Sequence, residues 1–140
     1  MAKSDTKHDH KPDPKLDVLV LGEHPATYLC AAVLRQSSKL RVLHATIPEE
    51  RPVDRTCLLN PAFFSLSKSL EPLKRKLDLT ALYGIQFLAD EPGTTSEHRA
   101  KSTLAYSVQY KDLRAAMMKV AADEGVETVT PKHLHIHRLD

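Results

Sequence analysis

The fold is decided by the stretch Lys15-Leu-Asp-Val-Leu-Val-Leu-Gly-Glu-His-Pro-Ala-Thr-Tyr-Leu-Cys-Ala-Ala-Val-Leu34, where an apolar run meets a glycine and then a second apolar run opened by proline. Residues 16–21 are apolar at almost every position, which is typical of a parallel strand covered on both faces. Pro25 suits the first position of a helix, because the amide hydrogen that it lacks has no partner there in any case. The stretch therefore predicts a buried strand, a turn at Gly22 and a helix.

The helix is expected to end near residues 37–38. Its apolar spacing predicts a stripe that faces the sheet, made of Ala26, Leu29, Ala32 and Val33. Cys30 lies in the same apolar run and is expected to be a small buried thiol. Residues 40–45 read as a second strand, and the connection between the two strands has the length that a right-handed βαβ crossover needs.

The remaining pattern alternates between the two kinds of secondary structure. Pro72 interrupts the helical spacing of residues 61–77, which predicts a kink or two short helices. The helix expected over residues 111–124 should bury Leu113, Met117, Val120 and Ala121 and stop at Gly125. The other expected elements are loops over 47–61 and 90–102 and strands over 83–89, 103–110, 126–129 and 133–137. Such an order predicts an α/β fold with a partly parallel sheet.

Composition sets the outer limits of the interpretation. The 140 residues have room for one domain, and 41% hydrophobic with 27% charged residues is ordinary for a globular chain. Residues 1–14 alternate lysine with aspartate and predict a disordered charged tail, which leaves residues 15–140 as the domain. A net charge of +2 gives no reason to expect nucleic acid. No run is long enough for a membrane span and no signal peptide is visible, so a cytoplasmic location is expected.

The turn after the first strand matches part of a dinucleotide-binding motif. In G-x-G-x-x-G the first glycine bends the chain, the second admits a pyrophosphate, and the third lets helix and strand pack closely. Gly22 fills the first position, whereas His24 and Thr27 fill the second and third. The motif therefore predicts the βαβ fold better than it predicts pyrophosphate binding, since Glu23 should repel a pyrophosphate and His24 stands where the pyrophosphate would approach.

Two segments together resemble the N-terminal part of FAD-dependent oxidoreductases of the aromatic-hydroxylase, flavin-dependent halogenase and geranylgeranyl reductase kind. Residues 17–27, Asp-Val-Leu-Val-Leu-Gly-Glu-His-Pro-Ala-Thr, are similar to the family's D-V-x-V-x-G-x-G-P-A-G. Residues 106–126 are similar to its strand, R-x-x-F-D and helix ending in A-x-x-x-G-V. The resemblance implies a Rossmann-like FAD/NAD(P)-binding βαβ fold over residues 15–140, truncated, with an additional helix and strands.

The resemblance also implies FAD as cofactor and gives a set of candidate binding residues. Those at the turn are Gly22, Glu23, His24, Pro25, Ala26 and Thr27; Thr46 or Glu49 would meet the ribose, and Leu134 would lie near the adenine. The chain departs from the family where the chemistry is. No carboxylate follows the second strand until Glu49, Tyr110 stands for the family's arginine, and Leu113-Arg114 stands for its F-D pair.

Two functions stay open from the sequence. One is an FAD-dependent oxidoreductase-like protein of the monooxygenase or halogenase type, without a recognisable substrate domain or a nominated catalytic side chain. The other is a non-catalytic, degenerate or split flavoprotein module, because an incomplete sheet has an edge that self-association or a complementary chain must cover. His133, His135 and His137 would share one strand face, which could bind zinc or nickel. No Cys, Asp or Glu is spaced to complete a closed site, so a half-exposed strand with a polar histidine face is favoured and no metal site is assigned.

Overall fold

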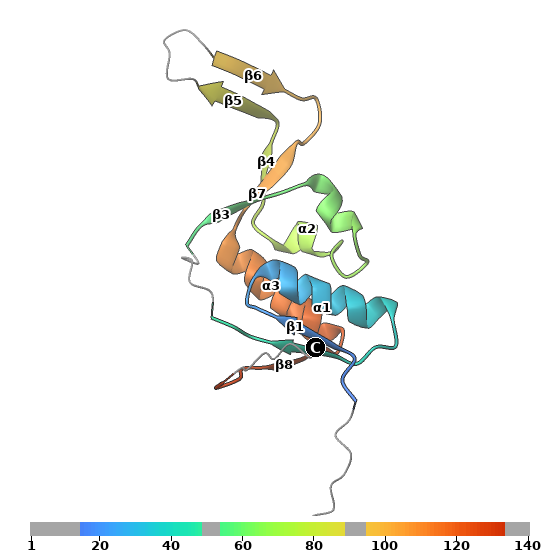
Figure 1. The fold of residues 1–140 in the computed structure, drawn as a ribbon. Helices are drawn as coiled ribbons and strands as arrows, with labels where there is room; N and C mark the ends of the chain where they lie inside the picture. Colours follow the sequence, from blue (N-terminus) through green and yellow to red (C-terminus); the bar gives the residue numbers. More distant parts are fainter. Residues whose placement is uncertain (1–14, 49–53, 89–94, 134–140) are drawn as a thin grey trace, which may run out of the picture.

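The computed structural model describes residues 15–48, 54–88 and 95–133. A three-stranded parallel sheet has the order β1 (Val18–Leu21), β2 (Val42–Ala45), β8 (Glu127–Val129). Two helices, α1 (Pro25–Ser37) and α3 (Tyr110–Asp123), pack against each other and lie on one face of that sheet (Figure 1). The fold class predicted from the sequence, α/β with a parallel sheet, is confirmed.

The other strands of the described residues form an antiparallel sheet and a separate hairpin. An antiparallel sheet has the order β3 (Thr56–Leu59), β7 (Ala105–Gln109), β4 (Thr80–Leu82), and a separate hairpin pairs β5 (Gly84–Leu88) with β6 (Thr95–Arg99). The hairpin stands at the far end of the molecule from the parallel sheet (Figure 1). Two short helices, the 3-10 helix η1 (Pro61–Ser65) and α2 (Leu73–Lys76), replace one straight helix, as the proline at position 72 predicts.

The core surrounds the two long helices, between the parallel sheet on one side and η1, α2 and β7 on the other, which contribute Phe64, Leu73 and Val108. Its fully buried side chains include Tyr28 and Ala31 of α1 and Met117 of α3. The predicted face of the last helix is confirmed, because Leu113, Met117, Val120 and Ala121 are all buried. Gly125 follows with a φ of +76°, the left-handed conformation that ends a helix at glycine.

Two predictions about burial near the N-terminus are wrong. Leu19 is 43% exposed at the centre of β1, because both helices cover the same face of the sheet and β1 is at its edge in the described part of the chain. Cys30 is exposed as well, since α1 buries Pro25, Tyr28, Ala31 and Ala32. The expected stripe is confirmed at Ala32, which is buried, and in part at Leu29, which is partly buried, but not at Ala26 and Val33, which are exposed. The ring of Tyr28 lies against β2 and rotates the buried face of the helix by about one position.

Two expected loops contain strands. β3 lies inside the loop predicted over 47–61, and β6 lies inside the polar loop predicted over 90–102. Both are stabilised by antiparallel partners that the local pattern does not reveal, β7 for the first and β5 for the second. The predicted tail 1–14 and most of the predicted strand 133–137 lie outside the described residues. Within the described ranges, no helix combines the length and the apolar character that a membrane crossing requires.

Candidate functional site

The candidate site is the turn between β1 and α1, at the carboxyl edge of the parallel sheet. Gly22 has a φ of +124°, and its amide donates to the carbonyl of Ala45 at 3.0 Å, so the turn lies beside the end of β2. A Cβ at Gly22 would meet the methyl carbon of Thr27 at 3.1 Å. Only glycine combines that backbone conformation with so close an approach.

His24 caps the helix with its own side chain. Its backbone is extended, and its Nδ1 accepts a hydrogen bond from the amide of Ala26 at 3.1 Å. The amide of Thr27 donates to the carbonyl of His24 at 2.9 Å, and Pro25 has no amide hydrogen. The amides with which a helix N-terminus holds an anion are therefore already used or missing at positions 25, 26 and 27.

Thr27 forms a hydrogen-bonded pair with a buried histidine of β2. Its Oγ1 lies 2.7 Å from the carbonyl oxygen of His24 and 3.3 Å from Nε2 of His44. A hydroxyl has one hydrogen, and the carbonyl of His24 is nearer to Oγ1 than that of Gly22 at 3.2 Å, so the hydrogen is assigned to His24 and, in the tautomer with a protonated Nε2, His44 donates to Oγ1. Thr27 and His44 thus join the helix start to the second strand.

His44 is fully buried and its ring lies 4.4 Å from that of Tyr28. Burial lowers the pKa of His44 below its ordinary value, against weaker opposing effects of the Gly22 backbone and the Glu23 carboxylate. The imidazole is therefore neutral near pH 7. Its Nδ1 and the hydroxyl of Tyr28 have no hydrogen-bond partner within the described part of the chain, which is a cost to stability.

Glu23 is neutralised by an arginine of α3. Its Oε2 lies 2.6 Å from Nη2 of Arg114, and each side chain is 22% exposed. The expected repulsion between Glu23 and a pyrophosphate is thereby largely cancelled, because an opposite charge lies within hydrogen-bond distance. The ion pair also links the turn to α3 at a partly buried position.

Tyr110 begins α3 and is fully buried. The guanidinium carbon of Arg55 lies 3.6 Å from the centre of its ring, a cation–π contact. The ring of His24 lies 5.6 Å from that of Tyr110. The sequence does not predict Arg55 as a residue of the site, because it directly precedes β3, whose sequence is typical of a loop, and no local signal marks it.

Thr46 lies at the same sheet edge, buried directly after β2. Its amide donates to the carbonyl of Val129 at 2.9 Å, and its hydroxyl lies 2.8 Å from that of Thr130. The structure therefore brings Thr46 near the turn, but its amide and its hydroxyl are already hydrogen-bonded to Val129, the last residue of β8, and to Thr130. Glu49 and Leu134 lie outside the described residues.

The residues present do not fit the pyrophosphate of FAD in the arrangement observed. A fitting site needs open amides and room at the second glycine position, whereas an imidazole caps the amide of Ala26 and a threonine fills the space above Gly22. The two motif departures and Glu23 between them each contact another part of the fold: His24 contacts Tyr110, Glu23 pairs with Arg114, and Thr27 pairs with His44. The side chains of Glu23, His24 and Thr27 thus find partners within the chain, whereas Nε of Arg114, Nδ1 of His44 and the hydroxyl of Tyr28 behind them have none in the part that the structure describes.

Comparison with known proteins supports the fold. No protein-family model matches the chain, and no curated protein matches its sequence. Among solved structures, it is similar to the halogenase PltM with a TM-score of 0.64, 19% identity and coverage of 91% of this chain and 31% of that one. The flavin-dependent brominase Bmp2 gives 0.60, 18%, 81% and 29%.

A reductase-like protein shows the same likeness. A geranylgeranyl bacteriochlorophyll reductase-like protein from Thermoplasma acidophilum gives a TM-score of 0.56, 17% identity, and coverage of 81% of this chain and 29% of that one. The chain therefore spans about a third or less of the length of the structures that it matches. The resemblance to the N-terminal part of such proteins is confirmed at the level of the fold.

Proposed function

We propose that this chain is an FAD-dependent oxidoreductase-like portion in which the nucleotide turn has become part of the core, so that it acts as a non-catalytic module through a protein partner. One observation carries the proposal. The side chains that replace the motif glycines and neighbouring residues contact one another within the protein, instead of leaving open the space and the amides that a phosphate needs. The likeness to the brominase and halogenase structures supports a shared fold, but it gives no evidence that this chain has their activity.

A second candidate is an active FAD-dependent oxidoreductase of the monooxygenase or halogenase type. It is favoured by Gly22, which keeps the left-handed turn at the carboxyl edge of a parallel sheet, where the N-terminus of α1 lies. In that case FAD would supply the redox chemistry. Residues 22–27 would face its pyrophosphate, and Thr46 or Glu49 would face its ribose.

The two candidates are separated by the visible absorption spectrum of the purified chain and by its thermal unfolding with added FAD. We expect no flavin absorbance and no change in melting temperature. A ligand present at one hundred times its Kd would stabilise the fold by about 2.7 kcal/mol, a clear shift for a chain of this size. Flavin absorbance that survives gel filtration would refute the module and support the oxidoreductase.

A double variant tests whether the turn itself blocks the cofactor. His24→Gly with Thr27→Gly removes the cap and reopens both motif positions, and we expect it to bind FAD more tightly than the parent chain. His98→Gly, at an exposed position of the β5–β6 hairpin at the far end of the molecule from the turn, is the matched control. Fluorescence titration of FAD measures both. Equal affinity in the parent and the double variant would show that the block lies elsewhere.

A further inference from the structure

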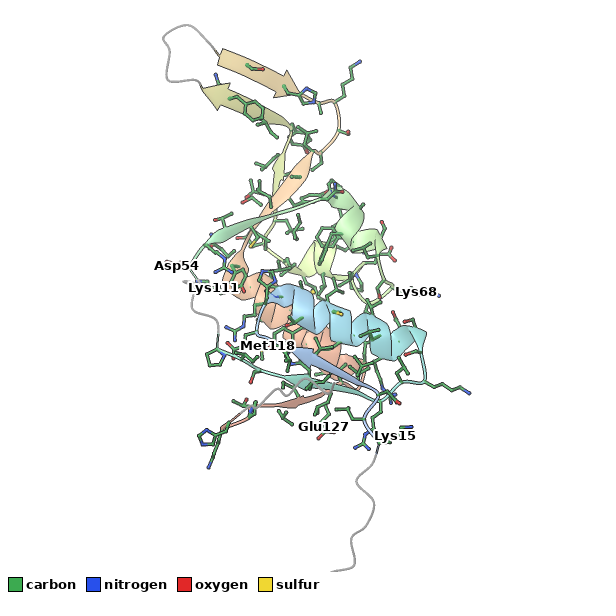
Figure 2. The ribbon with its side chains drawn as sticks, viewed as in Figure 1. Lys15, Asp54, Lys68, Lys111, Met118 and Glu127 are labelled. Carbon is green, nitrogen blue, oxygen red and sulfur yellow. The ribbon has the colours of Figure 1, made fainter. Side chains whose placement is uncertain are left out.

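The β5–β6 hairpin forms a two-stranded sheet of its own. Its two strands pair with each other, and in the described part of the chain neither is part of a larger sheet. The side chains of the hairpin lie on a ribbon that extends beyond the helices and the parallel sheet (Figure 2). Because an isolated two-stranded hairpin is at best marginally stable in water, this one has reason to gain further strands.

One face of the hairpin is apolar and open. Tyr83, Ile85 and Phe87 alternate along the chain and are 55%, 48% and 62% exposed. In the β5–β6 ladder, Ile85 pairs with His98 and Phe87 pairs with Ser96. The side chains of directly opposite residues lie on the same face, so His98 and Ser96 of β6 lie beside this apolar stripe. An exposed stripe of two aromatic residues and an isoleucine is typical of a surface that binds another protein.

The outer edge of β6 carries charges on the opposite face. The amide of Ala100 donates inward, to the carbonyl of Tyr83 at 2.8 Å. Since backbone groups alternate along a strand, the amides and carbonyls of Glu97 and Arg99 point outward, to the free edge. Their side chains contact each other and are 46% and 82% exposed, respectively.

We propose that a second copy of this chain adds its β6 to this edge, antiparallel, about a two-fold axis at His98. This register places Glu97 of each copy opposite Arg99 of the other, as a hydrogen-bonded pair, which agrees with the outward direction of both backbones. Moving the axis by one residue along the strand would place Glu97 opposite its own copy, or Arg99 opposite its own copy, and like charges in direct opposition are unfavourable. Charge complementarity therefore selects one register and makes the interface self-complementary.

The resulting sheet would have four strands. It would close the free edge of β6 in both copies and bring the two apolar stripes to one continuous face. The occupant is a copy of the chain because the edge is complementary to itself. This inference rests on the proposed function, in which the chain acts through a protein partner. Molecular mass tests the dimer and flavin absorbance tests the loss of the cofactor, so either proposal can fail while the other stands.

Sedimentation velocity of the full chain over a range of concentrations tests the proposal. We expect a reversible dimer. Glu97→Arg and Arg99→Glu, each alone, should weaken it at least tenfold, because each puts like charges opposite one another twice. The double variant with both changes should restore the dimer. An equimolar mixture of the two single variants should form a heterodimer, since the two arginines of the first variant then face the two glutamates of the second.

Circular dichroism should show unchanged folding for all variants, because both positions are exposed. Lys119→Glu, on the exposed face of α3, is the matched charge-reversal control and should remain dimeric. A parent chain that is monomeric at every concentration would overturn the proposal and leave the hairpin for a different protein. A dimer that neither single variant weakens would also overturn it, because the copies would then meet through another surface.

Discussion

Replacing Thr27 by valine tests the central claim that the turn is held by the chain's own side chains. Valine keeps the branched shape of threonine and loses only its hydroxyl. That hydroxyl lies 2.7 Å from the carbonyl of His24 and 3.3 Å from Nε2 of His44. The variant therefore removes one donor and one acceptor without creating a large cavity.

The expected cost is about 1–3 kcal/mol, because Nε2 of a fully buried imidazole loses its hydrogen-bond partner at Thr27. Thr27→Ser keeps the hydroxyl and loses one methyl group, so it should cost about 0.8 kcal/mol or less. The order of stability should be the parent chain, then the serine variant, then the valine variant. A simple packing role would reverse the last two, since valine fills the space above Gly22 better than serine does.

Urea unfolding measures these differences, provided that the m-value does not change. His44→Leu supplies a second background, in which the imidazole is absent and the valine substitution should cost less. We expect a coupling free energy between Thr27 and His44 of roughly 0.5–2 kcal/mol, within the range for residues in contact. Equal costs in the two backgrounds would refute the pairing of these residues and, with it, the claim that the chain's own side chains hold the turn.

Three further perturbations test neighbouring contacts. Glu23→Gln should destabilise the fold by about 1–2 kcal/mol, because Arg114 is left partly buried without its partner. Asp123→Asn, which breaks the exposed ion pair of Asp123 with Lys119 on α3, should cost about 0.5 kcal/mol or less; equal costs in urea unfolding would argue against a stabilising Glu23–Arg114 pair. His24→Ala should cost about 1 kcal/mol in thermal unfolding through the lost cap, and His24→Asn, which can cap, should recover most of it. Burial lowers the folded pKa of His44, so the unfolded chain takes up this proton first and stability should fall by up to about 1.4 kcal/mol per pH unit below about pH 6.5, until the folded pKa is reached. His44→Leu should reduce that slope, and an unchanged slope would mean that other groups cause it.

The sequence predicts the elements whose signal is local. The strand before Gly22, the helix opened by Pro25 and the helix stopped by Gly125 all depend on residues within a few positions of each other. Residues 56–59 and 95–99 are different, because their strand conformation comes from hydrogen bonds to partners that local spacing does not identify. Tertiary pairing therefore overrides a polar, loop-like sequence in both places.

The candidate site is predictable only in part, for the same reason. The departures at His24 and Thr27 are visible against a known motif, and so are the carboxylate of Glu23 between them and the tyrosine at position 110. Their partners are not visible, since Thr27 and His44 are 17 positions apart and Glu23 and Arg114 are 91 positions apart. Sequence spacing identifies the substituted positions here, whereas only the structure shows what the replacing side chains contact.

Those contacts bear on how the turn should be interpreted. Substitutions that merely damage a phosphate site leave polar groups without partners, and each such buried group costs free energy. In this chain the imidazole of His24, the carboxylate of Glu23 and the hydroxyl of Thr27 each contact a group from another part of the fold or cap the helix, whereas Nε of Arg114, Nδ1 of His44 and the hydroxyl of Tyr28 have no partner in the described residues. Removing one member of a pair should therefore expose its partner's desolvation cost, so the contacts of the turn contribute to folding stability while the unpaired groups behind them offset part of that contribution.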